Sequence, residues 1–152
     1  MAGGNNVSCK AYRGGIDLGY NQTKLVDSVS SYLDEGFNAV KIKVGHPDLS
    51  TDISRVQAVR HAIGPETVFM VDANYSYSIK QAINAAKRFE DYNVYWFEEP
   101  IIPDDFKGYA EVSKSINIPL AMGENLHTEQ EFLHAFQMSN LKFIQPDASN
   151  CG

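Results

Sequence analysis

The stretch Val68-Phe69-Met70-Val71-Asp72 decides the fold, because this short apolar run closes on an acidic residue and the chain repeats the form three more times. The later runs close on Glu98, Glu124 and Asp147, at spacings of 26, 26 and 23 residues. Such spacings suit one strand, one helix and two connections. Parallel strands buried on both faces read as continuous apolar runs, and in a β/α barrel their C-terminal ends carry the catalytic groups. We therefore expect the four acids around one pocket mouth.

A further apolar run extends from Ala39 to Gly45 and carries two lysines near its end. Side chains alternate across a strand, so Lys41 and Lys43 share one face. We expect their ammonium groups to face the acids. By the same alternation Asn74 shares a face with Asp72, which makes Asn74 a candidate for binding substrate.

The adjacent acids Glu98 and Glu99 cannot both point inward along one strand. We assign Glu98 to the inner face, and Glu99 to a supporting position behind it or toward the helices. Arg13 and Tyr20 lie near the end of the first expected strand, and both are therefore candidates for contact with substrate.

The strand-end motifs together resemble those of the enolase superfamily, in the mandelate racemase and muconate lactonizing enzyme family. They are, in order, Lys41-Ile42-Lys43, Val71-Asp72-Ala73-Asn74, Phe97-Glu98-Glu99-Pro100, Gly123-Glu124-Asn125 and Gln145-Pro146-Asp147. In that family the third, fourth and fifth strands each give one carboxylate to a Mg²⁺ ion. The resemblance implies that the ligands here are Asp72, Glu98 and Glu124. It also implies that Lys43 is the catalytic base, with Lys41 beside it.

The chemistry of proton removal next to a carboxylate requires such residue types. The product is a dianionic enediolate, so the site must place positive charge where that charge develops. An all-oxygen ligand set selects a hard cation such as Mg²⁺, and the sequence offers no cluster of cysteines and histidines that would favour zinc. A lysine base must be neutral to accept a proton, and we expect a neighbouring ammonium, the divalent ion and partial burial to lower its pKa.

Asp147 indicates the mandelate racemase branch of the family. In the muconate-lactonizing branch the sixth strand presents a lysine at the matching place, whereas in the mandelate racemase branch it presents an aspartate that orients a histidine from the seventh strand. The resemblance implies that this histidine would lie beyond Gly152, roughly one β/α unit further on.

The chain length of 152 residues leaves room for about six strands, whereas a complete eightfold barrel needs about 250 residues. We expect the strands at 7–13, 37–44, 67–72, 94–98, 119–123 and 142–145. The fold class is therefore α/β, a partial TIM-type barrel of about six parallel strands alternating with helices. We interpret residues 1–152 as a single partial barrel domain. The resemblance implies that it is the C-terminal catalytic domain of a larger enzyme, truncated at both ends, without the capping domain and the last two strands.

The intervening helices carry recognisable start signals. Capping-box patterns occur at Ser78 with Gln81 and at Thr128 with Glu131, each ahead of an apolar helical face. The other helices are expected at 23–35, 51–62 and 105–115.

Composition narrows the possible partners. A formal net charge of −6 provides no basic footprint for nucleic acid. No apolar stretch approaches the length of a membrane span, and the N-terminus does not resemble a signal peptide. Two cysteines are too few for a disulfide scaffold, so we expect reduced thiols and a cytoplasmic protein.

The function expected for the complete enzyme is Mg²⁺-dependent abstraction of the proton α to a carboxylate, with a small-molecule sugar acid as substrate. Acid-sugar dehydration is the preferred outcome, and racemisation, epimerisation or cycloisomerisation are alternatives. We also expect a homo-oligomer. A hypothesis of another class is a catalytically silent barrel fragment that self-associates through its open sheet edges. A metal-dependent aldolase is less favoured, because it does not explain the paired lysines.

Overall fold

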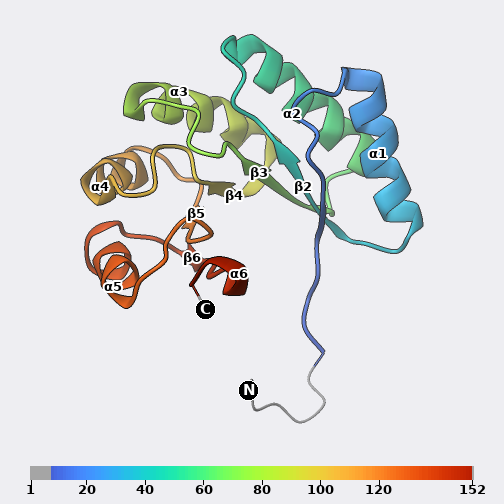
Figure 1. Ribbon diagram of the computed structural model, residues 1–152. Coiled ribbons are helices and arrows are strands. Elements are labelled where there is room, and N and C mark those ends of the chain that lie inside the picture. Colours follow the sequence, from blue (N-terminus) through green and yellow to red (C-terminus); the bar gives the residue numbers. More distant parts are fainter. Residues whose placement is uncertain (1–7, 152) are drawn as a thin grey trace.

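Six parallel strands form one curved sheet in the order β1-β2-β3-β4-β5-β6, in a computed structural model that describes residues 8–151 (Figure 1). The strands are β1 Arg13–Gly14, β2 Ala39–Lys43, β3 Val68–Asp72, β4 Val94–Glu98, β5 Leu120–Met122 and β6 Phe143–Ile144. Each strand pairs with its neighbours in sequence, as repeated β/α units require. The predicted α/β fold, a partial β/α barrel, is confirmed.

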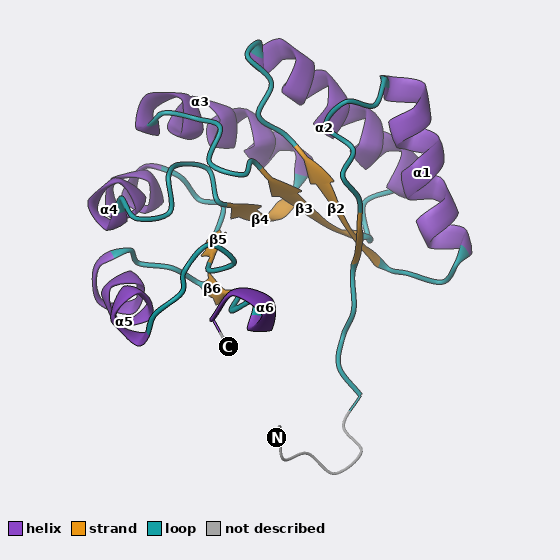
Figure 2. Ribbon diagram, viewed as in Figure 1, coloured by secondary structure: helices purple, strands orange, loops and turns teal. Residues whose placement is uncertain are grey.

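Five helices lie on the outer, convex side of this sheet (Figure 2). They are α1 Gln22–Asp34, α2 Leu49–Ile63, α3 Ile79–Phe89, α4 Phe106–Ser115 and α5 Glu129–Met138, with a 3₁₀ turn η1 at Glu90–Tyr92. The short helix α6, Ala148–Cys151, lies beside β6 toward the concave side. Both predicted capping boxes are present, at the starts of α3 and α5. No helix within residues 8–151 has the length and apolar character to cross a membrane.

The main hydrophobic core lies between the sheet and the outer helices. Phe97 of β4 is fully buried there, and its ring meets Phe89 and Tyr77 edge-on at centroid distances of 5.7 and 6.1 Å. A smaller apolar cluster of Met70, Trp96 and Ala121 is separate from this core. Alternation along the strands therefore gives the sheet two apolar layers and leaves the strand ends for polar groups.

The first strand is much shorter than expected. We expected a strand at 7–13, but Val7 lies outside the described residues and the structure has only Arg13–Gly14 in β1. Arg13 is paired with Val40, so Tyr12 stands opposite the first residue of β2, and residues before Tyr12 have no strand opposite them. Residues 8–12 are exposed and without regular structure, because the edge of the sheet offers them no hydrogen-bonding partner strand.

The stability of this fold should depend on the outer core. We expect Phe97→Ala to lower the free energy of unfolding by about 3–5 kcal/mol, because a fully buried ring is replaced by a cavity. Tyr95→Ala is the matched control, since Tyr95 lies in the same strand and is 48% exposed; its cost should stay below about 1.5 kcal/mol. Denaturant unfolding of both variants measures the difference. Equal losses would place the core elsewhere.

Candidate active site

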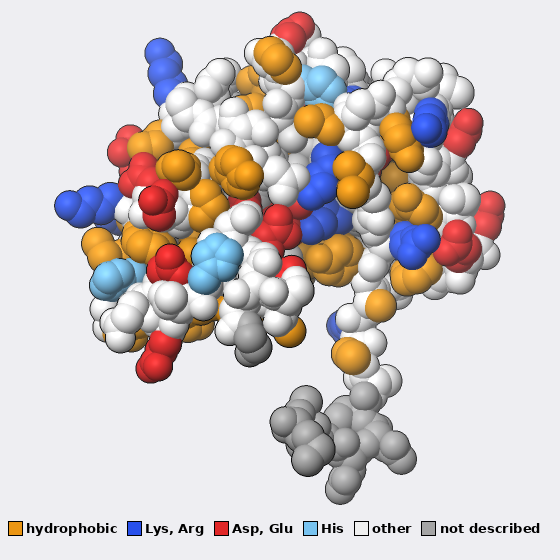
Figure 3. Space-filling model, in the orientation of Figure 1, with side chains coloured by type: hydrophobic (Ala, Val, Ile, Leu, Met, Phe, Trp, Pro, Cys, Tyr) orange, Lys and Arg blue, Asp and Glu red, His pale blue; other side chains and the backbone are white. Residues whose placement is uncertain are grey.

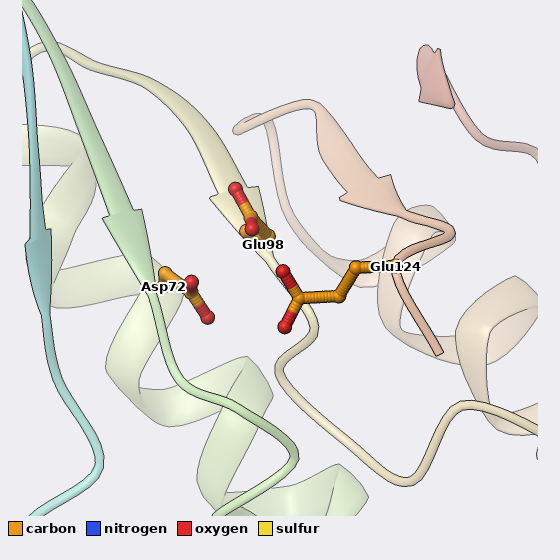
Figure 4. Close-up of side chains that lie close together, drawn as sticks. All are labelled: Asp72, Glu98 and Glu124. Carbon is orange, nitrogen blue, oxygen red and sulfur yellow. The ribbon is translucent and has the colours of Figure 1, made fainter. Parts of the chain in front are cut away.

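Three acidic side chains converge at the C-terminal ends of neighbouring strands (Figure 4). Asp72 ends β3, Glu98 ends β4 and Glu124 follows β5. Each offers one carboxylate oxygen, and these three oxygens lie within 4.8 Å of one another. Asp72 and Glu98 are buried, while Glu124 is half-buried. The convergence that the spacing predicts is thus present for three of the four acids.

The register of the sheet sets the level of these groups. Lys43 pairs with Asp72 across β2 and β3, and Asp72 pairs with Glu98 across β3 and β4. Because paired residues of adjacent parallel strands carry side chains to the same face, these three side chains start at one height on the inner face. A shift of one residue in either pair would turn one of them outward.

An irregularity in β4 is needed for this arrangement. Phe69 pairs with Val94 and Val71 with Phe97, so β4 has one residue more than β3 between these pairs. Such a bulge changes which face the following residues occupy. Val94 and Phe97 both pack in the outer core, and Glu98 therefore points inward with the other acids.

The turn after β5 brings Glu124 to the other acids. Gly123 has φ of +140°, a conformation that L side chains rarely adopt, and a Cβ there would lie 2.9 Å from the backbone N and O of Gln145. Only glycine fits here, where the backbones of residues 123 and 145 approach each other. The Nδ2 group of Asn74 donates to Glu124 Oε1 at 3.1 Å, and the backbone N–H of Asn74 donates to Asp72 Oδ1 at 2.9 Å. Asn74 is thus placed beside the acids, as expected for a substrate contact.

Both lysines face the acids. Lys41 Nζ lies 2.6 Å from Glu98 Oε1 and 3.3 Å from Asp72 Oδ2, and Lys43 Nζ lies 2.6 Å from the same oxygen of Asp72. Figure 3 shows basic and acidic side chains meeting in the hollow in the middle of the displayed face. Three carboxylates and two ammonium groups leave one negative charge in excess, which is an arrangement that can accept a cation.

Burial and charge act against each other on the pKa values here. Burial alone would lower the pKa of Lys41, but Glu98 and Asp72 outweigh it and raise that pKa. Burial likewise would raise the pKa of Asp72, yet Lys41 and Lys43 hold it below its usual value. The pKa of Glu98 is raised, by burial first and by the charge of Asp72 second. Both lysines are therefore ion-paired to the acids.

Two side chains that hold Glu98 were not among the site residues expected from the sequence. Trp96 Nε1 and Gln145 Nε2 each donate to Glu98 Oε2 at 3.0 Å. Gln145 shares a strand face with Asp147 in the sequence pattern, so alternation could have identified it. Trp96 stands two residues before Glu98, so the same alternation could have identified it as well, although its apolar neighbours favoured a core position.

Glu99 takes the supporting position expected for it. Its side chain is fully buried, Oε2 accepts from Asn125 Nδ2 at 2.6 Å, and Oε1 has no hydrogen-bond partner among the described residues. Burial, together with the negative charges of Glu124 and Asp72, raises the pKa of Glu99 to about 7, although the Asn125 hydrogen bond opposes this. Glu99 is therefore partly protonated near neutral pH.

Asp147 lies apart from the three acids and begins α6. Its Oδ1 accepts from the backbone N–H and the hydroxyl of Ser149, and its carbonyl accepts from the N–H groups of Asn150 and Cys151. The Ser149 hydrogen bonds hold the pKa of Asp147 below its usual value. The structure thus gives Asp147 a capping role at the start of α6.

Arg13 and Tyr20, which we expected to contact substrate, are not brought to the acids. Arg13 pairs with outward-facing Val40, and its guanidinium lies over the rings of Tyr32 and Phe37 at 5.4 and 6.0 Å. Tyr20 packs on the outer core, and Lys24 Nζ lies 3.8 Å above its ring.

The donor chemistry of the site fits a hard divalent cation. All three groups that lie close enough together to bind one ion are carboxylates: Asp72, Glu98 and Glu124. Oxygen ligands of this kind suit Mg²⁺, which takes few carboxylates and completes its shell with water and substrate oxygens. Zinc sites normally include histidine or cysteine.

A family comparison supports the resemblance seen in the motifs. The profile of the family described as enolase C-terminal domain-like matches residues 24–152. The 3,6-anhydro-α-L-galactonate cycloisomerase of Streptomyces coelicolor is 40% identical over 152 residues, which are all of this chain and 42% of that protein. The chain thus spans about two fifths of the length of this relative.

Solved structures agree with the sequence match. A racemase from Streptomyces coelicolor with bound magnesium has a TM-score of 0.91 and 40% identity, over 94% of this chain and 43% of that one. A mutant L-talarate/galactarate dehydratase liganded with Mg and L-glucarate has a TM-score of 0.89 and 32% identity, over 93% of this chain and 36% of that one.

The raised pKa of Glu99 predicts a pH effect on stability. A carboxyl group with pKa about 7 when folded and 4.5 when unfolded stabilises the metal-free protein fully below pH 4.5, and this stabilisation is lost as the pH rises through 7. We expect Glu99→Gln to be more stable than the wild type at pH 8, by up to about 3 kcal/mol, and similar to it at pH 4.5.

Denaturant unfolding in a chelator, from pH 4.5 to pH 8, measures this difference. Glu111→Gln on the exposed side of α4 is the control and should follow the wild-type curve. A Glu99→Gln curve parallel to that of the wild type would mean that Glu99 is ionised throughout.

Proposed function

The chain belongs to the enolase superfamily, in its mandelate racemase and muconate lactonizing type, and from this we propose that the protein removes the proton α to the carboxylate of a sugar acid with the help of Mg²⁺. One observation carries the proposal. Three carboxylates and two lysine ammonium groups from successive parallel strands meet in one partly open cluster. An ion-pair cluster built only for stability would be costly, because buried charges lose their hydration.

Asp72, Glu98 and Glu124 would hold the metal ion. When bound, Mg²⁺ supplies positive charge that offsets the second negative charge of an enediolate. Lys41 and Asn74 already contact the acids, so they orient the carboxylates toward one point. Trp96 and Gln145 occupy the second oxygen of Glu98 and fix that side chain in its rotamer.

Lys43 is the better candidate for the base. Among the described residues its Nζ makes one ion pair, with Asp72, whereas Lys41 Nζ is held by both Glu98 and Asp72. The Lys43 side chain is also more exposed, at 19% against 12%. A divalent cation on the three acids would turn the excess charge of the cluster from −1 to +1, and that change favours loss of a proton from an ammonium group. Lys43 would then accept the α-proton, and Lys41 would contribute fixed positive charge.

We propose that proton abstraction is followed by loss of a β-hydroxyl. The protein would then be an acid-sugar dehydratase. The mutant L-talarate/galactarate dehydratase supports this, because it shares the fold of the chain and was solved with L-glucarate, a sugar acid. Cycloisomerisation is the second candidate, since the Streptomyces coelicolor relative at 40% identity is a cycloisomerase of a sugar acid. Both begin with the same proton abstraction, so the residues described above serve either outcome.

Metal binding should stabilise the folded protein by mass action. At Mg²⁺ about 100-fold above the dissociation constant, the gain in unfolding free energy should be about 2.7 kcal/mol. We expect Glu98→Gln to lose most of this gain, whereas Glu129→Gln, on the exposed surface of α5, should keep it. Thermal unfolding with and without Mg²⁺, compared within each variant, measures the effect. A wild-type melting temperature that ignores Mg²⁺ would argue against a formed site.

Loss of the base should separate proton transfer from metal binding. We expect Lys43→Ala to slow exchange of the α-proton of a sugar acid with solvent deuterium by about 10² to 10⁴-fold, and to keep the stabilisation by Mg²⁺. Lys80→Ala, at an exposed position of α3, is the control. Near-normal exchange by Lys43→Ala would assign the base to another residue. No exchange by the wild type, tested with a panel of sugar acids, would favour a non-catalytic chain.

A further inference from the structure

The backbone of Lys43 is held by side chains where a strand would otherwise lie. The last pair between β1 and β2 joins Gly14 to Lys41. Val44 donates its N–H to Asp72 on the β3 side, so the N–H and carbonyl groups of Lys43 face the β1 side. Among residues 8–151, no strand residue pairs with Lys43 there.

A buried ion pair fills this place. Asp17 Oδ1 accepts the Lys43 N–H at 2.9 Å, and Arg55 Nη2 donates to the Lys43 carbonyl at 3.3 Å. The same Arg55 nitrogen lies 3.0 Å from Asp17 Oδ1, so the two side chains that hold the backbone of Lys43 are also bonded to each other. Asp17 and Arg55 are each only 3% exposed.

Arg55 also fastens the loop that carries Asp17. Its Nη2 group donates to the Asp17 carbonyl at 2.9 Å, and Nη1 donates to the Tyr20 carbonyl at 2.7 Å. The guanidinium thus joins α2, the loop after β1 and the end of β2. Burial raises the pKa of Asp17 and lowers that of Arg55, which shows that both charges are costly here. A strand in this place would bond the N–H and carbonyl groups of Lys43 without burying charge. The ion pair is therefore not explained by stability alone.

We propose that Asp17 and Arg55 are positioning residues for Lys43, and that they set where its side chain stands relative to Asp72. This inference rests on the proposed role of Lys43 as the base. A base must be held closely, since a misplacement of about 1 Å can cost about 10²-fold in rate. Asp17 and Arg55 touch Lys43 through its main chain and take no part in proton transfer.

Two double variants form a matched test. Asp17→Leu with Arg55→Met replaces the ion pair by apolar groups of similar volume, a change that buried pairs often tolerate, and leaves the Lys43 N–H without an acceptor. Asp17→Asn with Arg55→Met differs from it by one nearly isosteric side chain, and its amide oxygen can still accept that N–H. Arg60→Met controls for loss of an arginine from the same helix, because Arg60 bonds the carbonyls of Gly64, Thr67, Tyr92 and Asn93.

The first measurement is deuterium exchange of the α-proton of a sugar acid at saturating Mg²⁺, per folded molecule. We expect the Leu/Met variant to be slower than the wild type by about 10²-fold, the Asn/Met variant to recover much of this loss, and Arg60→Met to match the wild type. The Mg²⁺-induced rise in melting temperature should be alike in all four proteins. Wild-type exchange by the Leu/Met variant would overturn the proposal, and so would an equal loss in both double variants.

The second measurement is hydrogen exchange of the Lys43 amide, which needs no substrate. Protection should fall in the Leu/Met variant and persist in the Asn/Met variant, while the Ile42 amide stays protected in both. Should the wild type exchange no α-proton at all, the proposed function fails, and this amide measurement still decides whether the pair holds Lys43. Equal protection of Lys43 in both double variants would overturn the positioning role.

Discussion

The pairing of Lys43 with Asp72, and of Asp72 with Glu98, is the constraint on which the rest of the site depends. It places opposite and like charges side by side on one face of a sheet that is otherwise apolar. The buried carboxylates of Asp72 and Glu98 are direct neighbours and would repel each other strongly. Lys41 lies between them and contacts both, and together with Lys43 it balances the charges of these two carboxylates.

The two faces of the sheet divide the work of the molecule. The outer face packs apolar side chains against α1 to α5, and this contact supplies the stability that offsets the buried charges. The strand ends carry the polar groups, on turns that leave the outer packing intact. Positive φ values occur there at Asn74, Tyr75, Glu99 and Gly123. Such strain commonly accompanies functional sites.

Much of this arrangement could be predicted from short-range patterns. Apolar runs ending in Asp72, Glu98 and Glu124, and the alternation that joins Lys41 to Lys43, depend on a few neighbouring residues. The capping boxes are equally local, and both are present. The first strand was placed less well: it was expected at 7–13, and the described residues have only Arg13–Gly14 in β1. The extra residue in β4 is invisible in a continuous apolar run, although Glu98 lies on the inner face expected for it. The contact of Asp17 with Arg55 joins residues 38 apart, which no local pattern reveals.

Gly123 ties the acids to the edge of the sheet. Because its backbone lies against that of Gln145, β6 cannot shift without displacing the turn that carries Glu124. Gln145 also holds Glu98, and Asn150 donates to the carbonyl of Glu124 at 2.7 Å. The two-residue strand β6 is therefore anchored by polar contacts to the site as well as by its own ladder. Order at the edge of the sheet and ligand binding at the acids are then thermodynamically linked. A ligand that binds the acids will therefore also stabilise β6.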